Sequence, residues 1–217
     1  TRRSSDLVEI TAKDDVDHAR NSVRAVGGGS AVLQDFDALD RCGRDGVQVD
    51  RAAEAGKLFQ SFFTKPPTGA TVDQVMFTRL RYGLLMDKIG LAAKQANHWK
   101  ETLQFFEKSQ KAGTPMELAP AYVAQIKYMD AESQYEKFMA MKIAGPEKKM
   151  RDKDLGKFLL KQLTDKAKAL KALEDTYIAI YKLGAAEYGL ASLVKMGQAY
   201  ENMSETLMKS YVPTNLT

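Results

Sequence analysis

The sequence is poor in the side chains that most enzyme and metal sites use. Among its 217 residues there are one cysteine, Cys42, and two histidines, His18 and His98. A single cysteine excludes an internal disulfide, and with two histidines it forms no metal-ligand cluster at useful spacing. The nucleophile and zinc motifs Gly-x-Ser-x-Gly and His-Glu-x-x-His do not occur. The sequence therefore predicts a protein without catalytic residues, cofactor or metal, and not an enzyme.

Long apolar runs are also missing. No stretch approaches the roughly 20 apolar residues of a membrane span, and the first residues lack the apolar core of a signal peptide. The chain opens without Met, on Thr1-Arg2-Arg3-Ser4-Ser5-Asp6-Leu7. Reverse-translated with suitable codons, residues 1–7 match a widely used sequencing adapter, so we expect them to be an assembly artefact. The native N-terminus, with any signal peptide or lipid anchor, would then be missing.

Three short features resemble reactive sites, and each has a more ordinary interpretation. Cys42 precedes Gly43 at a predicted helix end, where the helix dipole disfavours a reactive thiolate. The Gly-Gly-Gly-Ser stretch at 27–30 lacks the lysine of a phosphate loop, which indicates a linker. Glu132 and Glu136 share a helix face, but the Glu-x-x-His of a di-metal bundle is absent. We expect these carboxylates to form a solvated surface.

Charge is distributed unevenly along the chain. Residues 1–50 hold 7 Lys+Arg against 10 Asp+Glu, and the remainder holds 25 against 18. This change predicts a poorly defined helical segment over residues 1–50 and a helical-repeat domain over residues 51–217. Lysine and glutamate interleave at helical spacing in the second part, without a block of one sign. The pattern favours a solvated surface and excludes a nucleic-acid partner, which would require clustered arginine and exposed aromatics.

Apolar residues three and four apart predict helices, and no period-two stretch of strand length appears. The capping box Thr71-Val72-Asp73-Gln74 predicts the start of a long helix that runs to about Ala96. The helix before it is expected to bury Leu58, Phe59 and Phe62. The expected helices cover about 12–26, 31–42, 51–64, 72–96, 98–111, 116 or 120 to 144, 147–183 and 186–211. The predicted fold class is all-α, with antiparallel neighbours joined by short turns.

One helical pattern recurs in degenerate form. Leu193-x-x-Met196-Gly197-x-x-Tyr200 fits the first helix of a tetratricopeptide repeat, whose small residue leaves a notch for a neighbouring helix. A longer match consists of Met86-x-x-Ile89-Gly90-x-x-Ala93, then Thr102, Phe106, Ser109 and Pro115. We therefore expect antiparallel hairpins stacked as a tetratricopeptide-like α-solenoid. In that arrangement Gly197→Leu should destabilise the fold by overpacking, by about 1–3 kcal/mol.

The C-terminal part of the chain resembles a narrower group. The stretches that carry the resemblance are 136–145, the Lys-rich helix through Leu173-Glu174-Asp175-Thr176-Tyr177, 188–202 and Tyr211-Val212-Pro213. They are similar to tetratricopeptide-repeat proteins of predatory and gliding bacteria, especially the adventurous-gliding-motility proteins of the outer membrane and periplasm. The resemblance covers 120–213 well and 71–119 loosely. Tyr188 stands where the family has Trp, and the chain stops where members continue into further repeats.

The resemblance implies a scaffold of the bacterial cell envelope that holds a protein or peptide partner in the solenoid groove. In the repeat frame the groove-facing residues are Leu84, Asp87, Leu91, Lys94 and Gln95 in one repeat, and Ala191, Val194, Gln198, Glu201 and Asn202 in the other. We expect alanine at Lys94, Gln198 and Asn202 together to weaken partner binding without lowering the melting temperature. The alternative is a compact helical bundle that acts as a coiled-coil oligomerisation module through the helix at 147–183.

Overall fold

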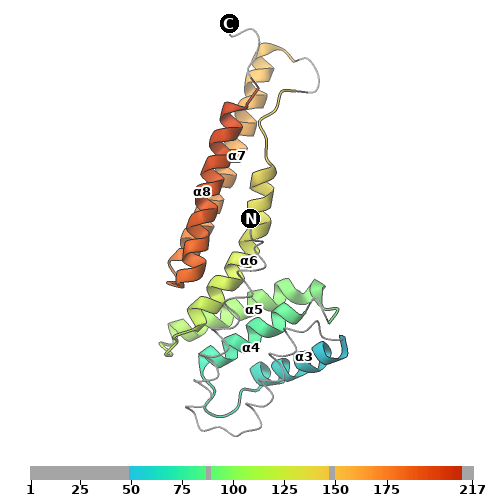
Figure 1. Cartoon of the computed structure of the whole chain (residues 1–217), viewed down its shortest axis with the longest axis vertical. Coiled ribbons are helices and arrows are strands. Elements are labelled where there is room, and N and C mark those ends of the chain that lie inside the picture. The colour runs from blue at the N-terminus through green and yellow to red at the C-terminus, as the bar shows by residue number, and fades with distance from the viewer. Residues whose placement is uncertain (1–48, 87–88, 147–149, 212–217) are drawn as a thin grey trace. The chain divides into compact units, whose positions relative to one another are not determined.

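The computed structural model describes residues 49–86, 89–146 and 150–211. Those residues form six helices and no strand, which confirms the all-α fold class (Figure 1). The chain divides into two compact units, Thr1–Met116 and Glu117–Thr217. The two helices expected before residue 43 lie outside the described residues, and the domain boundary expected near Asp50 stays a prediction.

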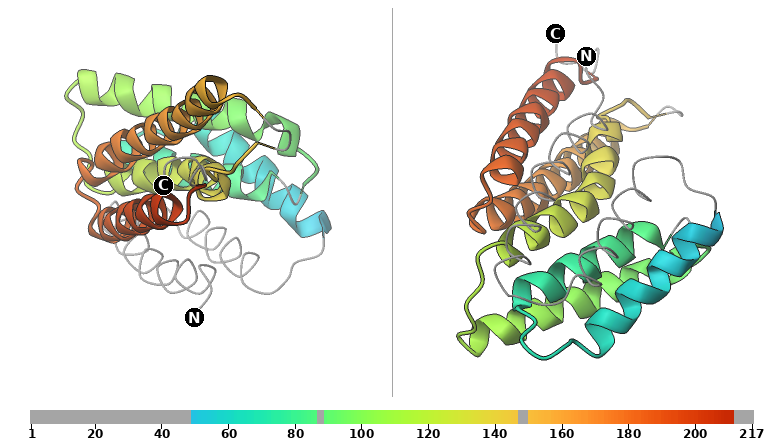
Figure 2. Two further views of the ribbon diagram at one scale, coloured as in Figure 1. Left: turned by 90° about the horizontal axis from the view of Figure 1, so that it is seen from above. Right: turned by 60° about the horizontal axis from the view of Figure 1, so that its bottom comes forward.

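Unit 1 contains α3 (Val49–Thr64), α4 (Val72–Leu85) and α5 (Ala92–Lys111). Helix α4 packs against both α3 and α5, as the right-hand view of Figure 2 shows. The core is made by the buried residues Ala55, Phe59, Tyr82 and Met86, with Phe63, Leu85, Ile89 and Leu91 packed around them. Leu58 is 44% exposed, so its predicted burial is wrong. Because α3 turns the face of residues 55, 59 and 63 toward α4, Leu58 points away from the core.

The predicted capping box is confirmed at the start of α4. The Thr71 hydroxyl accepts a hydrogen bond from the Gln74 amide at 3.2 Å, and the Thr71 amide donates to Gln74 Oε1 at 3.0 Å. The predicted end of this helix near Ala96 is wrong. Helix α4 ends at Leu85, and the chain turns through Gly90, whose φ of +72° suits glycine.

The glycine that admits a neighbouring helix in unit 1 is Gly83 and not Gly90. A Cβ at Gly83 would lie 2.0 Å from the Trp99 ring, whereas a Cβ at Gly90 would meet nothing within 4 Å. The Trp99 side chain of α5 therefore packs directly on the α4 backbone. Met86 follows the end of α4, Gly90 lies in the turn before α5, and Ala93 already belongs to α5, so these residues are not the first helix of a repeat as the sequence pattern predicted.

Unit 2 contains α6 (Ala119–Ala140), α7 (Asp152–Tyr181) and α8 (Ala186–Met208). These bounds are close to the expected ranges. Each of the three helices packs against the other two, and α7 runs opposite to α6 and α8 (Figure 1). Their shared core consists of Ala124, Ala131, Tyr135, Phe138, Leu173, Tyr177, Ile180 and Ala199. The α7–α8 hairpin covers residues 152–208, which is more than the roughly 34 residues of a tetratricopeptide repeat.

Side chains of α7 hold the extended segment that follows α6. Gln162 makes two hydrogen bonds to Ala144, accepting from its amide at 3.0 Å and donating to its carbonyl at 3.1 Å. Lys166 Nζ donates to the carbonyl of Met141 at 2.6 Å. Further along, Gly145 lies against the Tyr211 ring. A Cβ added to Gly145 would lie 2.7 Å from Cδ2 of that ring. The segment that leaves α6 is therefore in contact with α7 and with Tyr211, three residues beyond the end of α8.

Of the three large α8 residues that were expected to pack, Met196 lies against the core of unit 2, but Leu193 and Tyr200 lie outward. Leu193 and Tyr200 are 46% and 47% exposed, and a Cβ at Gly197 would meet no atom within 4 Å. The buried face of α8 instead carries the small residues Gly189, Ser192 and Ala199. Small side chains let α8 approach α6 and α7 closely, which explains why this face is the inner one. The prediction that Gly197→Leu overpacks the fold is therefore wrong.

Candidate functional site

The first predicted group of groove residues does not lie on one helix face. Leu84 is half-buried on α4, and Leu91 is the N-cap of α5, packed on the core of unit 1. Lys94 is exposed on α5, and Gln95 Nε2 donates to the carbonyl of Gly83 at 2.9 Å. Asp87 lies outside the described residues. The structure thus spreads the group over two helices and the turn between them.

The second predicted group, Ala191, Val194, Gln198, Glu201 and Asn202, lies on α8. Gln198 Oε1 accepts a hydrogen bond from the Tyr135 hydroxyl of α6 at 2.9 Å. Asn202 Oδ1 accepts one from Lys166 Nζ of α7 at 2.7 Å. Alanine at Gln198 and Asn202 would remove these interhelical bonds, so the structure gives a reason to expect a lower melting temperature instead of an unchanged one.

Lys166 is a buried lysine that connects all three helices of unit 2. It is 1% exposed, it donates to Met141 just after α6 and to Asn202 of α8, and its Nζ lies 4.7 Å from the centre of the Phe138 ring of α6. Burial lowers the pKa of the Lys166 ammonium. Sequence reasoning treated this lysine as solvated. Its position between Leu163 and Leu170, in register with the apolar stripe of α7, is the signal that could have identified it.

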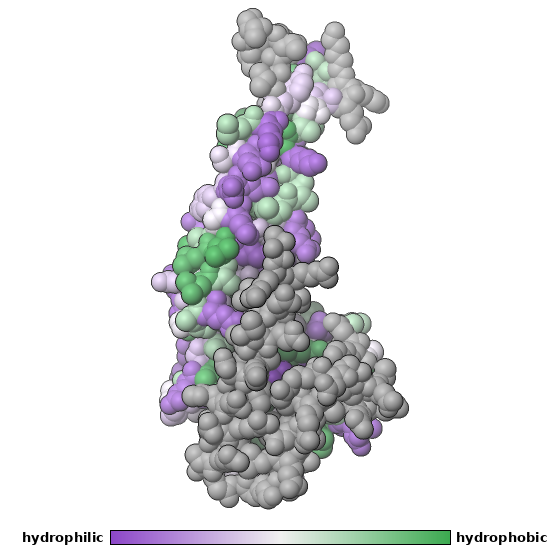
Figure 3. Space-filling view, viewed as in Figure 1, coloured by the Kyte–Doolittle hydropathy of each residue, from purple (hydrophilic) through white to green (hydrophobic). Residues whose placement is uncertain are grey.

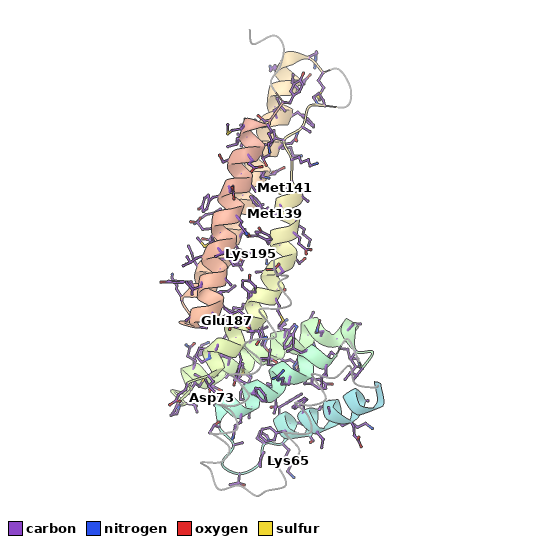
Figure 4. The ribbon with its side chains drawn as sticks, viewed as in Figure 1. Lys65, Asp73, Met139, Met141, Glu187 and Lys195 are labelled. Carbon is purple, nitrogen blue, oxygen red and sulfur yellow. The ribbon has the colours of Figure 1, made fainter. Side chains whose placement is uncertain are left out.

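A second polar group connects α6 and α8. Lys195 Nζ lies 3.1 Å from Glu132 Oε2 and 4.1 Å from the centre of the Tyr135 ring. Figure 4 labels Lys195 on α8, and Met139 and Met141 at the carboxyl end of α6 and just beyond it. The other Glu132 oxygen, Oε1, is buried without a hydrogen-bond partner. The ion pair uses one oxygen of the carboxylate, and the Tyr128 hydroxyl also interacts with the Glu132 side chain.

The pKa values of two tyrosines near Glu132 are shifted further from neutral pH. Burial, and next the negative charge of Glu132, raise the pKa of Tyr128 to about 12 and also raise the pKa of Tyr177. The Tyr177 hydroxyl is buried without a hydrogen-bond partner. These phenols stay protonated at neutral pH. Among the residues that the structure describes, no group of three His, Cys, Asp or Glu side chains could hold a metal ion.

The exposed face of α8 is strongly apolar. Its large side chains and their exposed fractions are Leu190 65%, Leu193 46%, Val194 59%, Tyr200 47%, Leu207 43% and Met208 86%. Their spacing of three, four and seven residues places them on one side of the helix, opposite Ser192 and Ala199. We call this face, with Gly197 near its middle, the outer stripe of α8. Figure 3 shows a cluster of hydrophobic residues on the left, over the lower part of α8, with hydrophilic residues above and beside it.

The outer stripe is large for an exposed apolar surface. A large apolar side chain has roughly 200 Å² of accessible surface, so the six exposed fractions correspond to roughly 650 Å². The largest apolar patch of a typical monomer covers roughly 300–600 Å², and larger ones mark interaction sites. Of the predicted groove residues, Val194 and Glu201 lie exposed on this side of α8. The outer stripe is therefore the best candidate site in the described residues.

A scan against protein-family models and searches of curated proteins and of solved structures returned no match to this chain. Within residues 49–86, 89–146 and 150–211, no helix combines the length and apolar character that crossing a membrane requires.

Proposed function

We propose that this chain is a non-enzymatic helical scaffold that binds a protein partner through the outer stripe of α8. The observation that carries the proposal is the exposure of six large apolar side chains on one face of a helix whose opposite face is already packed. Leaving roughly 650 Å² of such surface in water is unfavourable by roughly 25 cal/mol per Å², so covering it favours association.

A setting in the bacterial cell envelope and a tetratricopeptide-like stacking belong to the same proposal. Their support is the resemblance of residues 188–202 to gliding-motility repeat proteins and the α4–α5 hairpin, whose span of 72–111 is near a repeat length. In a solenoid, each repeat buries its apolar face only against its neighbours. An uncovered outer stripe on α8 is what a repeat without its next neighbour would show.

The second candidate function is an oligomerisation module that acts through the long helix α7. One observation favours it, namely Leu160, which is 62% exposed on α7 among lysines. A single leucine offers much less apolar surface than the six side chains of the outer stripe. The α7 proposal is therefore the weaker of the two.

The two candidates are separated by a matched pair of variants, Leu193→Asp on the outer stripe and Leu160→Asp on α7. A photo-crosslinking amino acid at Val194, introduced in cells that express the protein, should give discrete crosslinked products. A crosslinker at the exposed Lys157 of α7 is the control and should give none. Leu193→Asp should remove the Val194 products, and Leu160→Asp should retain them. The reverse result would support α7, and equal products at both crosslinker positions would contradict both proposals.

A further inference from the structure

We propose that the occupant of the outer stripe is a second copy of this chain, with the two α8 helices antiparallel about a two-fold axis at Gly197. This inference rests on the proposed function, because it requires the outer stripe to be a docking surface. Its distinguishing feature is that the same residues serve both sides of the interface.

Part of the α8 sequence is complementary in size about Gly197. In an antiparallel pair centred there, each residue is level with the one at equal distance on the other side of Gly197. Leu190 is then level with Ser204 and Met208 with Ala186, so a large side chain meets a small one in these two pairs. The other residues of the outer stripe are level with large side chains, Val194 with Tyr200, Leu193 with Glu201 and Leu207 with Glu187. Gly197 faces its own copy, and its missing side chain lets the helices approach at the axis.

The available area fits a pair of copies. Roughly 650 Å² of exposed apolar side chain on each copy gives a total of at most roughly 1,300 Å² when two outer stripes meet. Specific protein interfaces bury roughly 1,200–2,000 Å² in total. A second copy would therefore bring the buried area to the lower end of that range with α8 alone.

The charges on α8 suit the antiparallel orientation. Residues four apart on a helix differ by about 40° in direction around its axis. Glu201 therefore lies beside the outer stripe, and Glu205 and Lys209 lie successively further from it. Lys209 lies 2.8 Å from Glu205 of its own helix. At a rise of about 1.5 Å per residue, Lys209 and Glu187 stand about 18 and 15 Å from Gly197 on opposite sides. Antiparallel pairing therefore brings Lys209 of one copy beside Glu187 of the other.

Charge-reversal variants at Gly197 test the two-fold axis. Sedimentation equilibrium of the full chain should show a concentration-dependent dimer. Gly197→Lys and Gly197→Glu should each weaken dimerisation at least about tenfold, because two like charges meet at the axis, and an equimolar mixture of the two variants should restore it. The fold should tolerate both changes, since a Cβ at Gly197 meets no atom. Gly156 on α7 is the matched control, because it is also exposed and also meets none.

Cysteine crosslinking locates the axis independently. In a Cys42→Ser background, Gly197→Cys should form an intermolecular disulfide on oxidation, and Gly156→Cys should not. A disulfide requires Cα atoms within about 7 Å, which only the axis position provides. A monomeric wild-type chain, or variants at Gly156 that behave like those at Gly197, would overturn the inference. If the monomer still gave Val194 crosslinks to a different protein, the proposed function would stand; loss of those crosslinks as well would overturn both.

Discussion

At the scale of single residues, the hydroxyl groups of Tyr177 and Tyr135 are expected to have different effects on the stability of unit 2. The Tyr177 hydroxyl is buried without a hydrogen-bond partner, whereas the Tyr135 hydroxyl donates to Gln198 at 2.9 Å. Tyr177→Phe should therefore leave the free energy of unfolding unchanged or raise it by about 1 kcal/mol. Tyr135→Phe should lower it by about 0.5–1.5 kcal/mol. Urea denaturation followed by circular dichroism at pH 7 measures both values, and a larger loss for Tyr177→Phe would contradict the assignment.

The same tyrosines predict how stability changes in alkali. Burial and the charge of Glu132 raise the pKa of Tyr128 to about 12 and raise that of Tyr177, compared with about 10 in the unfolded chain. A folded-state pKa above the unfolded value gives a stabilisation that is complete below pH 10 and is lost as the pH rises toward 12. The wild-type free energy of unfolding should fall in that interval, and it should fall less steeply in Tyr177→Phe. Equal slopes for the two proteins would contradict this.

At the scale of elements, α7 holds the segment after α6 through Gln162. Gln162→Ala would leave both the amide and the carbonyl of Ala144 without their bonds, so this segment should open more often. We expect faster hydrogen exchange at Ala144 and a loss of about 1–2 kcal/mol in stability.

Thr164→Ala is the control for Gln162→Ala. The Thr164 hydroxyl bonds only to Leu160 within α7, so its loss should not speed exchange at Ala144. Equal exchange at Ala144 in both variants would show that Gln162 does not hold the segment.

The sequence was a good guide to where the helices of unit 2 lie. The expected ranges 147–183 and 186–211 enclose α7 and α8, and the expected start at 116 or 120 lies near that of α6, because glycine and proline mark the boundaries. Helix α6 ends at Ala140, before the predicted stop at Gly145-Pro146. The end of α4 was missed because Met86, Ile89 and Ala93 continue the helical spacing across a turn made by Gly90. The same spacing around a glycine occurs within a helix and across a turn, so the pattern alone does not distinguish the two.

The sequence was a poor guide to which face of α8 is buried. Leu193 and Tyr200 are exposed, and the buried residues of α8 are the small Gly189, Ser192 and Ala199. Local hydrophobicity favours burial of Leu193 and Tyr200. Burial of the small residues follows instead from the close approach of α6 and α7. For the same reason, the outward Val194 and the inward Asn202 were both assigned to the groove. Which of these two residues points outward depends on tertiary packing, and the sequence pattern of one helix does not contain that information.

At the scale of the whole molecule, the aromatic residues report separately on the two units. Trp99 is the only tryptophan and lies in unit 1, whereas all tyrosines except Tyr82 lie in unit 2. Gly83→Val should push Trp99 off α4 and destabilise unit 1 by about 1–3 kcal/mol. The tryptophan fluorescence transition should shift to lower urea, while the near-ultraviolet tyrosine signal should retain its wild-type midpoint. Equal shifts of both signals would contradict separate cores.

The pairing of α6 with α8 sets the order in which unit 2 can be completed during synthesis. The bonds from Tyr135 to Gln198 and from Lys195 to Glu132 each join residues 63 positions apart. At a translation rate of about 5–20 residues per second, Glu132 is made roughly 3–13 seconds before Lys195. During that time α6 displays its Glu132 carboxylate and Tyr135 hydroxyl without their α8 partners. A ribosome that stalls within α8 would therefore hold a nascent chain whose first helix in this unit is made but not yet enclosed.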